Sequence, residues 1–364
     1  MKNHHSYWER EEWLRQPELL IVGAGIVGAS TALFYKEKYP HHEVIIIDKG
    51  ITPEGASTRN AGFACIGSVS EHLVDMESTG EETVLNRIER RWNGLQLLRK
   101  TLGDQEIDYQ HTGGYEIFTD NEKFDKCRNK IPFLNRELEK RIGVKNVYSE
   151  KLFRGYHAIY NRVEGAINSG KLMRSIHKIL AEKGVRAFWN CKVKSVSEKS
   201  VLFDDGFQIA ARNIVLAVNG FIPRLAEVSV KPARGYVFVT KPIPGLPWKG
   251  TFHFDEGFVY FRNIDDKLLL GGGRNIAMEE ETTDEFGVNK KIKEYLVHFA
   301  NQVLKLPGSW QIDIEWSGIM GMSENKEPVI EEIESGVWVA AGLSGMGIAI
   351  GMQVAKDLLQ KMDS

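Results

Sequence analysis

The sequence predicts an α/β protein with two domains: a doubly wound domain built from three chain segments, and a mixed-sheet α+β domain. Two observations carry this prediction. An apolar strand over residues 18–22 runs into a group of glycines and an amphipathic helix, and a second apolar strand at residues 44–47 ends in Asp48. Further apolar strands follow at residues 213–218 and 337–341, so the doubly wound elements fall at the start, middle and end of the chain.

The first strand leads into the pattern G-x-G-x-x-G, which reads Gly23-Ala24-Gly25-Ile26-Val27-Gly28. Gly23 allows a sharp turn, Gly25 lets backbone approach a pyrophosphate, and Gly28 lets the helix pack tightly on the sheet. The helix N-terminus offers N–H groups to phosphates. Asp48 follows Gly28 by about 20 residues, the spacing of an acid that accepts hydrogen bonds from ribose hydroxyls. Together these features predict a Rossmann-type dinucleotide site; the alternative is a glycine-rich turn without a ligand.

Bulk composition narrows the class of protein. A chain of 364 residues that is 42% hydrophobic and 26% charged is typical of a globular protein with two domains. A net charge of −2 provides no basic field for nucleic acid or anionic lipid. Cys65, Cys127 and Cys191 lie far apart without C-x-x-C, so we expect no disulfide scaffold and no bound metal. No apolar run approaches the ~20 residues of a membrane span and residues 1–15 are unlike a signal peptide, which favours a cytoplasmic location.

We assign residues 1–75, 155–225 and 316–364 to the nucleotide-binding domain, and residues 76–154 and 226–315 to the second domain. Apolar residues at three- and four-residue steps predict helices at 81–102, 169–183, 288–304 and from the last glycines to about 361. Residues 105–119 favour a hairpin, followed by helix within 122–150. Short strands are expected at 185–189, 192–196, 201–203 and 207–210, and residues 234–273 are rich in strands.

The C-terminal strand enters a second glycine-rich turn with Gly342, Gly345 and Gly347 before the closing helix. Backbone N–H groups and a helix dipole at such a turn can meet negative charge. Reduced flavin carries negative charge at N1 and the C2 carbonyl, and donors there stabilise that charge as it develops. A nicotinamide enzyme has no need for this segment, which favours FAD. The alternative is a glycine-rich helix start that only packs.

Four blocks together resemble the FAD-dependent D-amino-acid oxidase superfamily, particularly its glycine-oxidase-like and D-amino-acid-dehydrogenase-like branch. They are the N-terminal motif with Asp48, the loop 55–63, the pair 192–193 with the strand 214–220, and the segment 339–349. The resemblance covers the chain beyond about residue 17. It implies FAD contacts at Gly23, Ala24, Gly25, Ile26, Val27, Gly28, Asp48, Lys49, Ser57, Thr58, Arg59, Asn60, Ala61, Gly62, Phe63, Val193, Asn219, Gly220, Gly342, Leu343, Ser344, Gly345, Met346, Gly347 and Ile348. Cys65, just beyond the loop, is expected to be an ordinary buried thiol rather than a flavin attachment site.

Two strand patterns predict the substrate side. Alternation in residues 234–240 places Arg234, Tyr236 and Phe238 on one face, and alternation in residues 258–262 groups Phe258, Tyr260 and Arg262. Aromatic rings with arginines suit an amine that carries an apolar body or a carboxylate, although ordinary sheets are also rich in aromatic residues. We therefore expect Tyr260, Arg262 and Arg234 to be the catalytic residues.

One departure from the related family matters for the substrate. In glycine-oxidase-like relatives, the segment resembling residues 316–320 ends in an arginine that grips the substrate carboxylate, and this chain has Met320 there. A second arginine of those enzymes is missing from residues 343–346. Either Arg262, Arg234 or Arg274 takes over this task, or the substrate is not a simple α-amino acid. Residues 260–262 and 59–60 look closer to branches that oxidise γ-glutamyl-amines or related secondary amines.

The resemblance implies an FAD-dependent oxidoreductase that oxidises an amine or amino-acid C–N bond to an imine by hydride transfer to flavin N5, with oxygen or a quinone as electron acceptor. Three alternatives stay open: a nicotinamide dehydrogenase, an FAD-dependent hydroxy-acid or glycerol-phosphate-type dehydrogenase, and a non-catalytic flavin-holding subunit for electron transfer. The expected partners are a small-molecule substrate and the electron acceptor, with no nucleic acid and no transmembrane segment.

Overall fold

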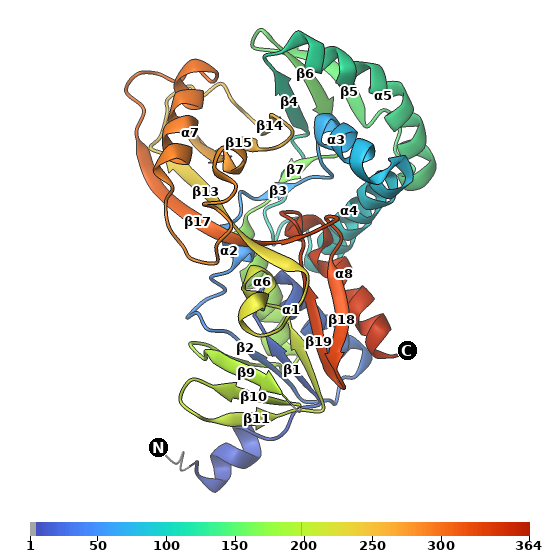
Figure 1. Ribbon diagram of the computed structural model, residues 1–364, viewed down its shortest axis with the longest axis vertical. Coiled ribbons are helices and arrows are strands. Elements are labelled where there is room, and N and C mark those ends of the chain that lie inside the picture. Colours follow the sequence, from blue (N-terminus) through green and yellow to red (C-terminus); the bar gives the residue numbers. More distant parts are fainter. Residues whose placement is uncertain (1–4, 198) are drawn as a thin grey trace. The chain divides into compact units, whose positions relative to one another are not determined.

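The computed structural model describes residues 5–197 and 199–364 (Figure 1). The chain forms two compact units, each built from separate chain segments. Unit 1 comprises Met1–Thr58, Gly170–Ala233 and Ile319–Ser364, and unit 2 comprises Arg59–Ser169 and Arg234–Gly318. No helix among the described residues is long and apolar enough to cross a membrane.

Unit 1 is organised around a six-stranded sheet with the order β18-β19-β12-β1-β2-β8. All of its strands run parallel except β18, which pairs antiparallel with β19 at the edge. The strands and helices of this unit are η1 (Glu9–Trp13), β1 (Leu19–Val22), α1 (Ile26–Lys38), β2 (Val44–Ile47), α2 (Ala56–Arg59), α6 (Ser169–Glu182), β8 (Arg186–Phe188), β9 (Val193–Ser197), β10 (Ser200–Phe203), β11 (Gln208–Ala210), β12 (Asn213–Leu216), η2 (Asn219–Arg224), β18 (Val329–Glu334), β19 (Val337–Ala341) and α8 (Gly347–Met362). The α/β class predicted from the sequence is confirmed.

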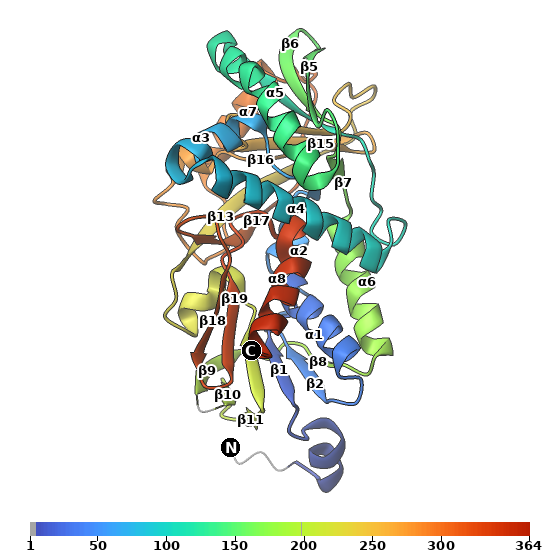
Figure 2. The same cartoon turned by 90° about the vertical axis from the view of Figure 1, so that its right-hand side faces the viewer.

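The two faces of this sheet are covered differently. Helices α1 and α8 pack against each other and against the sheet, as Figures 1 and 2 show. Gly351 of α8 permits this close approach, because a Cβ on it would lie 2.8 Å from the side chain of Ile26. Apolar side chains of the opposite face share a buried cluster with Val201, Phe203 and Ile209 of the three-stranded β9–β11 sheet. That face is therefore covered by a small sheet rather than by a second layer of helices.

Unit 2 contains an eight-stranded sheet with the order β17-β13-β16-β15-β14-β4-β6-β5 and a short pair, β3 with β7. Strands β13 and β17 and helices α2 and α6 extend across unit boundaries. The elements are β3 (Phe63–Ala64), α3 (Val69–Thr79), α4 (Glu81–Leu102), β4 (Gly114–Phe118), α5 (Asn121–Ile142), β5 (Tyr148–Phe153), β6 (Tyr156–Asn161), β7 (Gly165–Ala166), β13 (Val230–Thr240), β14 (Thr251–Phe254), β15 (Val259–Ile264), β16 (Lys267–Gly272), η3 (Arg274–Ala277), α7 (Lys290–Gln302) and β17 (Ile312–Ser323).

The two faces of the eight-stranded sheet have opposite characters. One face carries the aromatic core of unit 2, in which Phe238, Phe252 and Phe261 pack against apolar residues of α7. Strand register then places Tyr260 opposite His253 and Gly271 on the other face, since successive side chains of a strand alternate. We call this second face the site face.

The unit boundaries differ from the domain boundaries proposed above. Residues 59–75 and 155–169 were assigned to the nucleotide-binding domain, but they lie in unit 2. Pairing explains the difference: β3 pairs with β7, and β6 pairs with β4 and β5 in the large sheet. Helix α3 is not among the predicted elements; Ser68 caps its N-terminus by accepting a hydrogen bond from the Glu71 amide.

Candidate functional site

The glycine turn after β1 is built by close backbone approach. Gly23 has φ +108°, and a Cβ on it would lie 2.5 Å from the carbonyl oxygen of Ala217. A Cβ on Gly28 would lie 2.0 Å from the carbonyl oxygen of Gly23. Real Cβ atoms do not approach that closely, so a larger residue at either position would displace the turn. The geometry confines both positions to glycine.

Asp48 follows β2 and bonds the same turn. Its Oδ2 accepts a hydrogen bond of 2.8 Å from the Ala24 amide, and its Oδ1 accepts one of 2.9 Å from the Gly50 amide. Burial raises the pKa of Asp48 even though these two backbone donors act in the opposite direction. Each carboxylate oxygen keeps a second lone pair for a further donor such as a ribose hydroxyl.

Helix α1 begins beside the loop that leaves unit 1. Its N-cap, Gly25, has no side chain to cap the helix, and the Ile26 amide instead donates to the Ser57 hydroxyl oxygen at 2.9 Å. A Cβ on Gly25 would lie 2.9 Å from that same oxygen. An oxygen acceptor thus sits at the helix N-terminus, where a phosphate oxygen would also be favourable.

Asn219 connects two segments predicted to contact the cofactor. It follows β12 with a left-handed φ of +48°, and its Oδ1 accepts a hydrogen bond of 3.1 Å from the Gly342 amide. Left-handed φ values at Gly342, Ser344 and Gly345 then shape the turn that leads into α8. Gly220 is confined by its neighbour, since a Cβ on it would lie 2.3 Å from the carbonyl oxygen of Met320.

These predicted cofactor residues of unit 1 gather at one edge of the sheet. The glycine turn, Asp48, Asn219 and Gly342 follow β1, β2, β12 and β19, which are adjacent parallel strands. Chain order moves from β1 to β2 on one side and returns to β12 and β19 on the other side. Ligands of open α/β sheets bind at such a switch point, outside the carboxyl ends of the strands.

Two further predicted contacts lie near this edge of unit 1. Val193 starts β9, and the preceding Cys191 amide donates to the Asp48 carbonyl at 2.9 Å. Lys49 is exposed, with its Nζ 3.4 Å from the ring centroid of Phe221. Backbone next to Val193 therefore reaches the end of β2.

The remaining part of the predicted flavin loop, residues 59–63, belongs to unit 2 and is held there by side chains. Arg59 donates to the Ser317 carbonyl at 3.1 Å and lies 4.3 Å over the Phe286 ring. The Asn60 amide oxygen accepts bonds from the Gly62 amide at 2.8 Å and the Ser169 hydroxyl at 2.6 Å. These two polar side chains brace the loop within unit 2.

Arg262 holds this loop to β7. Its Nη1 donates to the carbonyl oxygens of Gly62 and Ile167, each at 2.8 Å, and the side chain is buried. Burial lowers the pKa of Arg262 to about 10, while Asp108 acts in the opposite direction. The geometry makes Arg262 a positioning residue for the loop.

The structure places the residues of the substrate face predicted on β13 away from the site face. Tyr236 and Phe238 are fully buried in the core, and Arg234 forms a bidentate pair with the buried Glu281 at 2.8 and 2.9 Å. Alternation correctly grouped side chains that share a face, but it does not show which face packs under α7. Arg234 is engaged by a structural carboxylate.

On β15, Tyr260 and Arg262 lie on the site face, and Phe258 precedes the strand. Tyr260, Ala61 and Trp316 each pack against a buried apolar cluster of β13 and β16, and the Phe63 and Tyr260 ring centroids lie 5.9 Å apart. Burial raises the pKa of Tyr260 to about 12. Its hydroxyl makes no hydrogen bond to any described residue, so it is available to a ligand.

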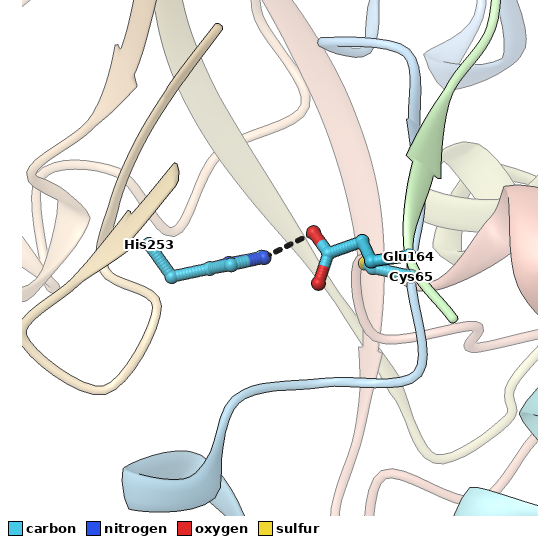
Figure 3. Close-up of side chains that lie close together, drawn as sticks. All are labelled: Cys65, Glu164 and His253. Atoms are coloured by element: carbon cyan, nitrogen blue, oxygen red, sulfur yellow. Dashed lines mark hydrogen bonds and ion pairs between the residues drawn. The ribbon is translucent and has the colours of Figure 1, made fainter. Parts of the chain in front are cut away.

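Sequence reasoning did not find a buried cluster of Cys65, Glu164 and His253 in unit 2 (Figure 3). The His253 Nε2 lies 2.5 Å from a Glu164 carboxylate oxygen, and the Phe63 ring packs edge-on against the imidazole at 5.2 Å. Burial opposes the charge on His253, but Glu164, Glu116 and Glu71 raise its pKa above the ordinary value. A usable signal was the alternation Thr-Phe-His-Phe in β14, which directs His253 away from the core.

Comparison with known proteins identifies the family. The sequence profile of the FAD-dependent oxidoreductase (DAO) family matches residues 18–360. The chain belongs to this family. It is 24% identical to a probable oxidoreductase OrdL of Rhizobium meliloti (strain 1021), over 94% of this chain and 82% of that protein.

Two solved structures share the fold of this chain. Glycine oxidase from Geobacillus kaustophilus has a TM-score of 0.72 and 20% identity, covering 95% of each chain. L-amino acid deaminase from Proteus vulgaris, with its specific insertion sequence deleted, has a TM-score of 0.72 and 19% identity, covering 95% of this chain and 90% of that chain. The protein is thus an FAD-dependent oxidoreductase, and the strand-end arrangement of unit 1 fits a dinucleotide.

Proposed function

We propose that this FAD-dependent oxidoreductase oxidises the C–N bond of an amine or amino acid to an imine. The observation that carries the proposal is the site face of unit 2, where Tyr260, Trp316 and Ala61 of the loop predicted to contact flavin all pack against one buried apolar cluster of β13 and β16. FAD supplies a hydride acceptor at N5 when it is bound. The names of the similar structures, a glycine oxidase and an L-amino acid deaminase, support an amine or amino acid as substrate.

We assign the cofactor contacts of unit 1 by their chemistry. The glycine turn and the N-terminus of α1 would hold the pyrophosphate, and Asp48 would accept hydrogen bonds from ribose hydroxyls. In the turn over residues 344–347, the Ser344 and Met346 amides already donate to the Gly321 and Leu343 carbonyls. The amides of Gly345 and Gly347 are therefore our candidates for donors to the flavin N1 and C2 carbonyl region. Asn219 supports this turn through its bond to the Gly342 amide.

The contacts of three arginines indicate which of them could bind a substrate carboxylate. Arg234 is paired with Glu281, and Arg262 holds two backbone carbonyls. Arg274, half-buried in η3, makes no hydrogen bond or ion pair with any described residue. Burial lowers the pKa of Arg274, and nearby Glu281 acts in the opposite direction. Helix η3 packs beside α7, and because Arg274 has no partner among the described residues, it is our candidate by elimination for binding a substrate carboxylate, in place of the arginine absent at Met320.

The substrate class is tested by anaerobic reduction of the purified flavoprotein. We expect flavin absorbance to bleach with a member of a panel of amino acids, N-alkyl amino acids, diamines and γ-glutamyl-amines. Hydroxy acids and glycerol phosphate should leave the spectrum unchanged. Bleaching by one of these alcohols, with every amine inert, would contradict the proposal. Stopped-flow reoxidation in air then distinguishes oxygen from a quinone as acceptor.

Two tyrosines of the same sheet provide a matched test of the site face. Tyr260→Phe removes a hydroxyl that has no partner within the described protein, so a change in kcat or KM would report a contact to substrate. Tyr236→Phe removes a hydroxyl on the core face that donates to Glu315. We expect Tyr260→Phe to lower kcat/KM at least tenfold, which corresponds to about 1.4 kcal/mol of transition-state stabilisation. Tyr236→Phe should lower only the melting temperature. The reverse pattern would place the substrate elsewhere.

A further inference from the structure

We propose that Cys65, Glu164 and His253 form a binding site for one divalent transition-metal ion, with Zn²⁺ the best match. One ligand atom from each residue lies within 4.8 Å of the other two, and all three side chains are buried (Figure 3). The ligands come from three separate parts of unit 2: the segment after β3, the turn before β7, and β14. The proposal is independent of the substrate assigned above.

The donor set is that of a zinc site. Thiolate, imidazole nitrogen and carboxylate oxygen are the three ligand types that bind Zn²⁺, at about 2.0–2.3 Å. Ligands of a tetrahedral ion lie farther apart than the 2.5 Å that separates His253 Nε2 from Glu164. The pair must therefore open by a fraction of an ångström around the ion, which side-chain rotation allows. Three protein ligands leave a fourth position for water or another donor.

The surroundings of the cluster orient its ligands. Asn161 Nδ2 donates to the second oxygen of Glu164 at 3.4 Å, as outer-sphere donors do at metal sites. A Cβ on Gly114 would lie 2.4 Å from the Glu164 carboxyl carbon, so glycine there makes room for the carboxylate. Phe63 packs against the His253 ring and restrains its rotation.

The charges of the three ligands also balance the charge of the ion. Zn²⁺ with one thiolate, one carboxylate and one neutral imidazole is a neutral set, which suits a buried position. Binding requires an unprotonated Nε2 on His253 and a thiolate on Cys65, and any proton displaced from these ligands goes to solvent. No electron transfer is involved.

The first test needs no variant. The full-length flavoprotein is purified from zinc-supplemented culture and analysed by elemental mass spectrometry, with a flavin-depleted sample measured in parallel. We expect one zinc ion per chain in both samples, because the ligands do not include flavin. Chelation should lower the melting temperature, and added Zn²⁺ should restore it in a concentration-dependent way. Zinc far below one ion per chain, with a melting temperature insensitive to chelator and Zn²⁺, would overturn the site.

Matched cysteine variants then assign the ligand. Cys65→Ala should lose zinc, whereas Cys127→Ala, which removes another buried thiol in α5, should keep it. Cobalt substitution of the chelated wild-type protein should give a thiolate-to-cobalt charge-transfer band in the difference spectrum, and Cys65→Ala should lack it. Zinc retained by Cys65→Ala would refute the assignment. Loss of zinc with unchanged amine oxidation would leave the proposed function intact, so the two proposals fail separately.

Discussion

The glycine turn of unit 1 and the site face of unit 2 are built in opposite ways. In the turn, residues close in sequence define the geometry, because Gly28 must lie against the carbonyl of Gly23. On the site face, Phe63, His253 and Tyr260 come from distant segments and meet only through strand pairing. The comparison teaches that a sequence motif can reveal a site formed by local backbone. A site formed by strand register can be recognised only once the three-dimensional structure is known.

Among the substitutions that test this comparison, we expect Gly25→Val to have the largest effect. Gly25→Val places its branched side chain where Ser57 Oγ and the proposed pyrophosphate approach the start of α1. Its φ of −72° is allowed for any residue, so the fold should survive while FAD binds more weakly. Overpacking of roughly 1–3 kcal/mol predicts an affinity for FAD that is about five- to 150-fold weaker. Flavin titration followed by fluorescence measures it.

Gly308→Ala provides the control for Gly25→Val. A Cβ on Gly308 would have no atom within 4 Å, so flavin content and folding should be unchanged. Far-ultraviolet circular dichroism must show that Gly25→Val is folded before its flavin content is interpreted. A folded Gly25→Val protein with full flavin occupancy would show that the turn does not contact the pyrophosphate.

The same comparison explains what could be predicted from the sequence. The periodic apolar residues of α4 and the strand that precedes Gly23 predicted those elements, because their signals lie within one local window. Sequence alternation could not show that the predicted residues of β13 and β15 lie on opposite faces of the sheet. The alternation is the same whether a strand face packs against α7 or against the loop 59–63. Glu164 and His253 lie 89 residues apart, and no sequence pattern links them.

The second prediction compares two arginines of unit 2. Arg274→Met should raise KM for a carboxylate-bearing substrate about a hundredfold, roughly 3 kcal/mol, because it removes one partner of a desolvated charge pair. Its flavin spectrum should be unchanged. Arg262→Met removes the donor to the Gly62 and Ile167 carbonyls. The Gly62 carbonyl keeps the Ile167 amide as a donor, so the cost in stability comes from the Ile167 carbonyl and should be about 1–3 kcal/mol. Steady-state kinetics and thermal unfolding measure the two effects.

We therefore expect Arg274→Met to weaken the affinity for substrate and Arg262→Met to lower stability. Arg262→Lys keeps one donor and should recover part of the melting temperature without a change in KM. If Arg262→Met raises KM with unchanged stability, Arg262 binds the substrate as the sequence predicted. If Arg274→Met has normal kinetics on every carboxylate substrate, the substrate carries no carboxylate or binds it elsewhere.

The smallest effect concerns His177 of α6, which links a distant helix to the local turn. Its Nε2–H donates to the Ala24 carbonyl at 2.9 Å. Burial lowers the pKa of His177, while its bond to Ala24 and the charge of Asp48 act in the opposite direction. The unfolded chain therefore binds a proton more readily than the folded chain. It follows that this group reduces stability as pH falls through the ordinary histidine pKa of 6.5.

His177→Gln keeps an N–H donor for the Ala24 carbonyl but cannot take up a proton. We expect the melting temperatures of wild type and His177→Gln to converge, or cross in favour of the variant, as pH falls from about 7.5 to 5.5. The shift should be a few degrees, because one group contributes about 1.4 kcal/mol per unit of pKa difference. Parallel curves for the two proteins would mean that His177 does not couple to acid unfolding.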